Sequence, residues 1–211
     1  MDISSIRKDY QLKSLSEQDV AEDAFGQFSR WWSEALQSEI DEVNAMTLAT
    51  VDQRNRPSAR IVLLKDFNAS GFVFYTNYDS NKGMQLESNP FASLVFFWKE
   101  LERQVRIEGQ CERVSSSESD AYFKSRPIGS QIGAAASPQS SIISDRSILT
   151  DKVEELKQQY TNGEIPRPAH WGGYRLIPET IEFWQGRSSR LHDRIKYLKD
   201  GATWKIVRLA P

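Results

Sequence analysis

Apolar residues near the start of the chain follow a helical period. After residue 21 they recur at spacings of three and four, at Phe25, Phe28, Trp32 and Leu36. This spacing predicts an amphipathic helix, and Glu22 and Asp23 suit its first turn because carboxylates are favourable there. Residues 1–20 are polar and aperiodic, so we expect them to form a mobile arm.

From residue 45 the pattern changes to runs of β-branched and aromatic residues. Five such runs, separated mostly by turns of hairpin length, cover residues 45–51, 59–67, 71–77, 91–98 and 103–114. Their close spacing predicts an antiparallel sheet that curls into a barrel. A short polar helix is expected after Asp79.

The second half of the chain mixes helical and strand patterns. Helices are expected at about 116–125 and 145–160, and the segment between them, "RPIGSQIGAAASPQSS" (126–141), is small and polar. Strand patterns return at 172–178, 180–186, 195–199 and 204–209. No internal repeat and no long linker divides the chain, so we predict one α+β domain over residues 21–211.

Composition narrows the class of function. The 211 residues are 39% hydrophobic and 11% aromatic, which suffices for a packed core. A formal charge of −2 and a pI near 5.8 argue against general binding to nucleic acid or a membrane surface, since both need a net basic face. Cys111 is the only cysteine, and no apolar run suits a membrane span or a secretion signal. We therefore expect a cytoplasmic protein whose anion sites are local.

Two segments of the predicted barrel carry candidate anion ligands. In "RIVLLK", Arg60 and Lys65 flank four apolar residues, and strand alternation places the two cations on opposite faces. In "YTNYDSNKG" (75–83), Asp79 or Ser80 can cap a helix whose first turn holds Lys82, and such a helix start can bind phosphate. Charges at a strand end and an ordinary helix start are the alternatives.

The segment "YFKSRPIGS" (122–130) offers a phenol, a guanidinium and a hydroxyl four residues apart. On a helix that runs into a turn at Pro127, Tyr122, Arg126 and Ser130 can converge on one anion, since guanidinium binds phosphate oxygens in pairs. An exposed helix end with unrelated polar groups explains them equally well. The loop "SPQSS" (137–141) can add amide and hydroxyl donors.

A further cluster of cations lies in "IEFWQGRSSRLHDR" (181–194). An extended backbone would align Arg190, His192 and Arg194, whereas a helix would align Arg187, Arg190 and Arg194. A solvated charge run is the alternative, but His192 near Trp184 favours a ligand pocket. The chain lacks a typical zinc set, a G-x-S-x-G elbow, a G-x-G-x-x-G fingerprint and a P-loop.

Together these motifs resemble the pyridoxine/pyridoxamine 5′-phosphate oxidase family from about residue 7 to Pro211. The motifs that carry the resemblance are "RIVLLK", "GFVFYTN", "ERQVRIEG", "YFKSRP", "SQIGA", "WGGYR", "IEFWQGR", "RLHDR" and "RLAP". The family implies an α+β split β-barrel with flanking helices, a homodimer, and noncovalent FMN at the dimer interface. It also implies an oxidase that makes pyridoxal 5′-phosphate in vitamin B6 metabolism and reduces O2 to H2O2.

The resemblance assigns site residues by position. It implies FMN binding by Arg60, Ile61, Val62, Leu63, Leu64, Lys65, Tyr75, Thr76, Lys82, Gln104, Gln139, Ser140, Trp184 and Arg194. It implies substrate binding by Arg7, Lys8, Asp9, Tyr10, Lys65, Tyr122, Arg126, Ser130, Arg190, Leu191 and His192. Arg190 and His192 would lie at the pyridine ring as catalytic residues, and the arm around residues 7–10 would fold over the substrate as a lid. No metal is expected.

Four residues, in three places along the chain, depart from the family pattern. Asn81 replaces a second phosphate-binding arginine, Ile128 and Gly129 replace an Arg-Asp pair, and Ala135 replaces a tryptophan. These departures concern FMN affinity and pocket packing. Two rival hypotheses remain: a flavin reductase with a nicotinamide donor, and a carrier of pyridoxal phosphate or flavin without enzyme activity. The preference between amine and alcohol substrates, the rates and any secondary pyridoxal phosphate site cannot be derived from the sequence.

Overall fold

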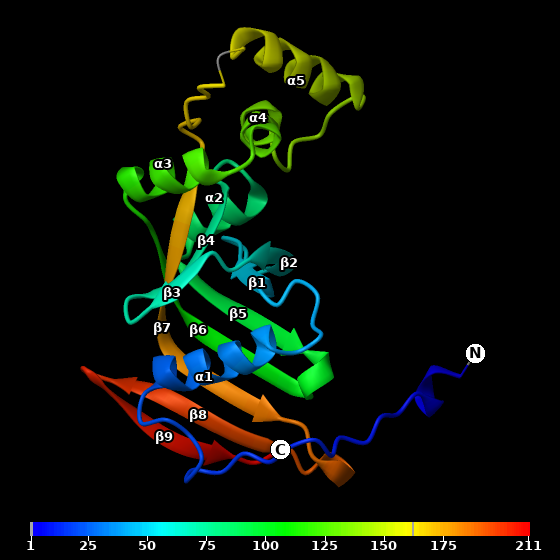
Figure 1. Ribbon diagram of the computed structural model, residues 1–211, viewed down its shortest axis with the longest axis vertical. Helices are drawn as coiled ribbons and strands as arrows, with labels where there is room; N and C mark the ends of the chain where they lie inside the picture. Colours follow the sequence, from blue (N-terminus) through cyan, green and yellow to red (C-terminus); the bar gives the residue numbers. More distant parts are fainter. Residues whose placement is uncertain (1, 162) are drawn as a thin grey trace.

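The computed structural model describes residues 2–161 and 163–211, so Met1, the first residue of the predicted arm, and Asn162 lie outside the described residues. Within these ranges the chain forms a nine-stranded antiparallel sheet and five α-helices (Figure 1). The strands are β1 (Ala45–Val51), β2 (Pro57–Leu63), β3 (Asp66–Asn68), β4 (Gly71–Asn77), β5 (Phe91–Trp98), β6 (Arg103–Arg113), β7 (Trp171–Gln185), β8 (Asp193–Asp200) and β9 (Thr203–Leu209). The helices are α1 (Ala24–Leu36), α2 (Asn81–Ser88), α3 (Ser116–Ser125), α4 (Ile128–Ala136) and α5 (Ser147–Gln159).

The long strand β7 organises the sheet. The strand order is β2-β1-β5-β6-β7-β4-β3, and β8 pairs with both β7 and β9. The first part of β7 pairs with β4 and its last part with β8, so the sheet splits into two branches along this strand. The predicted antiparallel, barrel-like sheet with flanking helices is confirmed.

Residues 172–178 and 180–186, expected as two strands, form one strand. The register between β6 and β7 shifts between Glu108 and Gly109, which face Thr180 and Pro178. This bulge lets β7 continue past Pro178, a residue that cannot donate a backbone hydrogen bond. A Cβ atom on Gly109 would lie 2.0 Å from the carbonyl oxygen of Ile177, so the close approach of the strands requires glycine here.

Three other expectations differ from the structure. The predicted strand 59–67 is interrupted after Leu63, and β3 begins at Asp66. Part of the segment 126–141 forms helix α4, whose buried face includes Ile132. In α1 the buried side chains are Ala24, Gln27, Phe28, Trp31 and Ala35, while Leu36 is exposed.

Two clusters of buried apolar side chains hold the helices and strands together. The larger cluster joins α1, through Phe28 and Trp31, to the inner side chains of the strands. The smaller one gathers Phe123, Leu156 and Trp171 beneath α3, α4 and α5, which lie together at one end of the molecule (Figure 1). Helices α3 and α4 therefore rest on a core of their own, beside the strands that they face.

The N-terminal arm contacts the body of the chain. Glu102 accepts hydrogen bonds from the backbone N–H groups of Gln11 and Leu12, at 2.9 and 3.1 Å, and pairs with Lys8 at 3.3 Å. The backbone N–H of Leu15, a buried residue, donates to Asp193. In the part of the chain that the structure describes, none of the helices combines the length and apolar character needed to cross a membrane.

Candidate functional site

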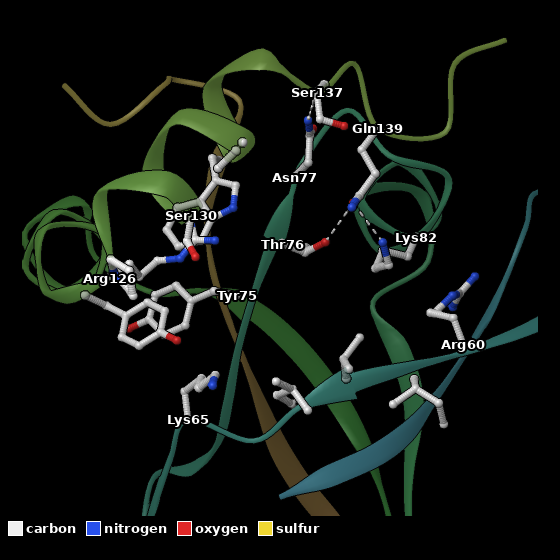
Figure 2. A pocket seen from close by; sticks show the side chains of 18 residues that line it. Arg60, Lys65, Tyr75, Thr76, Asn77, Lys82, Arg126, Ser130, Ser137 and Gln139 are labelled. Carbon is white, nitrogen blue, oxygen red and sulfur yellow. Dashed lines mark hydrogen bonds between the residues drawn. The ribbon is translucent and has the colours of Figure 1, made fainter. Parts of the chain in front are cut away.

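A cavity of about 930 Å³ opens between strands β2 and β4 and the helices α2, α3 and α4. Figure 2 shows its wall, with Arg60 and Lys82 on one side and Arg126 and Ser130 on the other. The segment after α4 contributes Gln139. The cavity therefore has two cationic corners.

Arg60 occupies the first corner. It lies in β2, and its guanidinium donates to the carbonyl oxygen of Leu48 at 3.2 Å, to Thr50 Oγ1 at 2.5 Å and to Ser58 Oγ at 2.7 Å. These acceptors are neutral oxygens. Partial burial lowers the pKa of Arg60, yet a guanidinium remains charged in proteins. Its positive charge therefore stays available to an anion in the cavity.

Lys82 completes this corner from the first turn of α2. Ser80 caps the helix and accepts from the backbone N–H of Gly83, as predicted for this segment. The ammonium of Lys82 donates to Gln139 Oε1 at 3.0 Å (Figure 2). It also donates to Ser80 Oγ at 3.3 Å. Burial and the positive charge of Arg60 lower the pKa of Lys82 to about 8. Two cations and a helix N-terminus suit a phosphate group.

Two predicted ligands near Lys82 have different surroundings. Gln139 also accepts from Thr76 Oγ1 at 3.3 Å, so its side chain is held inside the cavity. Ser140 has a positive φ of 72°, and its hydroxyl accepts from the backbone N–H of Asn81. Asn81 itself lines a neighbouring hollow with Arg54 and Gln85 instead of the main cavity.

Arg126, Tyr122 and Ser130 form the second corner, so the structure brings these three predicted residues together. Arg126 ends α3, and its guanidinium lies 4.6 Å from the ring centroid of Trp171. Its Nη1 atom is buried and has no hydrogen-bond partner among the described residues. Burial lowers the pKa of Arg126. A buried donor without an acceptor is costly, and an anion in this corner would satisfy it.

Lys65 lines the same cavity as Arg60, so the prediction that they leave opposite faces is wrong. Strand β2 ends at Leu63, and the chain turns before β3, so strand alternation does not extend to Lys65. The sequence also missed cavity residues whose types carry no charge. These are Asn77, Pro127, Gly133, Ala134, Ser137 and Trp171. Trp171 could have been predicted from the sequence, because it is the first residue of the motif "WGGYR".

A second group of predicted residues lies elsewhere on the same chain. Gln104, Trp184 and Arg194 form a row across β6, β7 and β8, because Trp184 is paired with Gln104 on one side and Arg194 on the other. The ring of His192 lies 4.5 Å from that of Trp184, and Tyr10 of the arm contacts both rings edge-on. This arrangement links the arm to the row of strand residues.

A cavity of about 470 Å³ lies beside this row. It is lined by arm residues Ile6 to Tyr10 and by Arg187, Ser189, Arg190 and His192. His192 Nδ1 accepts from the backbone N–H of Arg187 at 3.1 Å, which leaves Nε2 to carry the proton of the neutral ring. Burial and the charge of Arg190 lower the pKa of His192. Leu191, in contrast, is exposed.

The backbone of this segment is neither extended nor helical throughout, so neither alignment of its cations is correct. Ser188–Arg190 is a single 3-10 turn in which Ser189 and Arg190 have positive φ, and β8 begins only at Asp193. Arg194 Nε donates a hydrogen bond to Glu182 Oε1 at 2.8 Å, and its Nη1 donates to the carbonyl oxygen of Ala210. Arg194 therefore has a carboxylate partner, unlike Arg60.

The two groups of predicted residues do not meet within one chain. Helices α3 and α4 lie near one end of the molecule, and the turn after β7 lies near the other (Figure 1). The structure thus separates the predicted residues into two groups, which are called half sites below. In neither half do the described residues include a group of three or more His, Cys, Asp or Glu side chains that could hold a metal ion.

Comparison with known proteins gives the family. Residues 32–160 match the family model described as pyridoxamine 5′-phosphate oxidase. The chain belongs to the pyridoxamine 5′-phosphate oxidase family. Residues 171–211 match the model described as the pyridoxine 5′-phosphate oxidase C-terminal dimerisation region, which supports a homodimer. The resemblance found in the sequence is confirmed.

Curated relatives carry the same family name over their whole length. A pyridoxine/pyridoxamine 5′-phosphate oxidase of Trichormus variabilis is 57% identical over 210 residues, which cover 99% of this chain and 98% of the relative. One from Paraburkholderia phymatum is also 57% identical, and 99% of each chain is covered. Members of the family thus resemble this chain from end to end.

Solved structures support the fold. PhzG from Burkholderia lata, in complex with tetrahydrophenazine-1-carboxylic acid, has a TM-score of 0.89 and 32% identity, and covers 95% of this chain and 99% of its own. An FMN-binding protein of Nostoc punctiforme has a TM-score of 0.70 at 16% identity, with 94% and 99% covered. The second likeness shows the fold alone.

Proposed function

We propose that this chain is an FMN-dependent oxidase of vitamin B6 metabolism, which converts pyridoxamine or pyridoxine 5′-phosphate to pyridoxal 5′-phosphate. One observation carries the proposal. A single cavity has two cationic corners, Arg60 with Lys82 and Arg126 with Lys65, and among the described residues none of these cations forms a salt bridge with a carboxylate. Two phosphates, one of the cofactor and one of the substrate, match two such corners.

The cavity fits FMN by its donor set. Arg60, Lys82 and the N-terminus of α2 would hold its phosphate, with Gln139 and Ser140 beside them. Ile61, Val62, Leu63 and Lys65, with Tyr75 and Thr76, would border the ring system. The predicted residue Leu64 is instead buried in the larger apolar cluster and does not line the cavity. When bound, FMN supplies the two-electron acceptor for the hydride that leaves C4′ of the substrate.

The chain's own residues bind and orient the substrate. The unpaired Nη1 of Arg126 would donate to the substrate phosphate, with Tyr122, Ser130 and Lys65 around it. Holding the substrate by a phosphate that does not react places C4′ against the cofactor and removes the entropic cost of a chance encounter. The reaction consumes O2 and gives H2O2, and with the amine substrate it also consumes water and releases ammonia.

The second half site would come from the partner subunit. Gln104, Trp184 and Arg194 would then meet the cofactor, while Arg190, His192 and Leu191 would meet the pyridine ring. Two observations support this arrangement: the halves are apart within one chain, and Trp184 to Arg194 lie inside the region matched as dimerising. Arm residues Arg7 to Tyr10 border Arg190 and His192, which supports a lid over the substrate. A cytoplasmic location remains an expectation from the sequence.

Oxygen consumption and flavin content test this function together. We expect the purified protein to be yellow, to release FMN on acid precipitation, and to consume O2 with pyridoxamine 5′-phosphate but not with NADH alone. Oxidation of NADH without a vitamer would indicate a reductase, and bound flavin without any turnover would indicate a carrier. A colourless protein that takes up no FMN would contradict the proposal.

PhzG gives one further comparison for the same assay. Its solved complex contains a carboxylic acid, whereas the cavity of this chain brings Arg126 and Ser130 together in a corner that we propose binds phosphate. We therefore expect pyridoxamine without its phosphate to be a poor substrate. Equal kcat/KM for the phosphorylated and free amines would show that the second corner binds no phosphate.

A further inference from the structure

The guanidinium of Arg60 is fixed by a small network behind the cavity. Thr50, on the neighbouring strand β1, is 1% exposed and accepts from Nη1, while Ser58 accepts from Nη2. A third side chain, Gln85 of α2, accepts from Nη2 at 3.2 Å. Gln85 connects Arg60 to the same helix that carries Lys82.

The carboxamide oxygen of Gln85 is the centre of this network. Besides Arg60 it accepts from Thr50 Oγ1 at 2.5 Å and from Ser58 Oγ at 2.9 Å. One neutral oxygen thus receives three donors, two of which themselves accept from Arg60. The position of each group depends on the others, so the network holds the guanidinium in one place.

The chemistry of residue 85 matters because a carboxylate is the usual partner of a partly buried arginine. A glutamate would have the same length and would pair with Arg60 in an environment of low dielectric constant. The pair would cancel the charge that an anion in the cavity needs. An amide gives the same hydrogen bond while the full charge of Arg60 is retained.

We propose that Gln85 is a positioning residue of the cofactor-phosphate corner, which holds the guanidinium of Arg60 against β1 without neutralising it. This inference rests on the proposed function, since it takes the corner of Arg60 and Lys82 as the site for the phosphate of FMN. Gln85 acts through Arg60 and lies outside the set of residues that line the cavity.

The variant Gln85→Glu tests the charge of the tether, because it changes only the amide to a carboxylate. We expect its Kd for FMN to rise roughly tenfold to a hundredfold, the loss typical of a charge-assisted hydrogen bond. Its Kd for riboflavin, which lacks the phosphate, should stay within about twofold of the wild-type value. Both constants are measured by quenching of flavin fluorescence on titration with apoprotein.

Two controls make the outcome specific. Gln158→Glu adds the same charge on the exposed surface of α5 and should leave both constants unchanged. Gln85→Met removes the tether without adding a charge, and its Kd for FMN should lie between those of the wild type and Gln85→Glu. Thermal unfolding of each apoprotein shows that the variants fold.

The results separate the inference from the proposed function. A wild-type protein that binds no FMN would overturn both. A wild-type protein that binds FMN, with an unchanged Kd for FMN in Gln85→Glu, would overturn the role of Gln85 alone. Equal losses for FMN and riboflavin would also overturn it, since Gln85 would then support the fold of the corner and not its charge.

Discussion

At the scale of single residues, the fold lowers the pKa of Lys82, which the amino-acid sequence alone does not reveal. An exposed lysine has a pKa near 10.4 and would remain charged at any physiological pH. Partial burial beside Arg60 lowers the pKa of Lys82 to about 8. The ammonium is therefore close to losing its proton in the absence of an anion, and a bound phosphate dianion would favour the charged form.

The binding of FMN should consequently depend on pH through Lys82. Because the dianion binds the protonated lysine, affinity should be full below a pH of about 8 and should fall as the pH rises through that value. The decrease is at most about tenfold per pH unit. Titration of apoprotein with FMN from about pH 7 to about pH 9 avoids protonation of the phosphate itself, whose pKa is about 6.

Lys82→Arg is the control for this prediction. A guanidinium keeps its charge over the whole range, so the variant should bind FMN with nearly constant affinity. Riboflavin should show no dependence that can be assigned to Lys82. A wild-type Kd for FMN that is constant up to about pH 9 would show that the ammonium does not bind the phosphate.

The sequence was informative about charged ligands and uninformative about their supports. Arg126 and Ser130 could be predicted to converge, since their spacing from Tyr122 and the turn at Pro127 restrict where they can point. No pattern in the sequence indicated that Gln85 contacts Arg60 at the other corner. Its contacts cross from α2 to β1 and β2, and polar residues at helical positions are usually solvated.

At the scale of elements, the sequence predicted strands better than their ends. Runs of β-branched and aromatic residues predicted most of the strands, because these residues fit a pleated, half-buried surface. Helix α4 was missed because its glycines and alanines show no clear amphipathic period, although Ile132 packs beneath it. The sequence predicted two strands where β7 forms one, because a proline such as Pro178 usually ends a strand. In the structure, the bulge in the neighbouring strand β6 accommodates this proline.

The arm is an element held by several contacts, of which a buried carboxylate makes the most. Glu102 is 3% exposed and has a positive φ of 54°, and it accepts from two backbone N–H groups of the arm. In Glu102→Asn the shorter side chain cannot reach the arm, while asparagine tolerates the left-handed backbone. We expect trypsin to cleave at Lys8 and Lys13 roughly tenfold faster in this variant.

The exposed neighbour Glu100 provides the matched control. Glu100→Asn should leave the cleavage rate in the arm unchanged, since this side chain forms no hydrogen bond to the described part of the arm. Thermal unfolding of both variants shows whether the body of the protein remains intact. Equal cleavage rates in Glu102→Asn and the wild type would mean that other contacts, such as that of Leu15 with Asp193, hold the arm.

At the scale of the whole molecule, the predicted site residues lie in two separate groups on one chain. The cavity with Arg126 and the cluster with Arg190 and His192 do not meet, although the resemblance found in the sequence implies that one substrate contacts both groups. A two-fold symmetric dimer would resolve this, since each cavity would face the second cluster of its partner and two equal sites would form.

Heterodimers carrying two different tags test whether each site is shared. Alone, Arg126→Ala should raise KM for pyridoxamine 5′-phosphate roughly tenfold to a hundredfold, because it weakens binding of a group that does not react. Arg190→Ala should lower kcat on the order of a hundredfold while FMN stays bound. When one subunit carries Arg126→Ala and the other Arg190→Ala, a shared arrangement leaves one of the two sites intact. The purified heterodimer should then have about half the wild-type kcat/KM.

The reciprocal heterodimer gives the opposite result from the same substitutions. When one subunit carries both Arg126→Ala and Arg190→Ala and its partner is wild type, a shared arrangement damages both sites, so activity should be nearly lost. If each site lay within one chain, this second heterodimer would keep about half of the activity and the first would lose it. Flavin absorbance, measured on both species, distinguishes a damaged site from one that has lost its cofactor. The order of the two activities therefore decides whether Arg190 acts on the substrate held by the partner subunit.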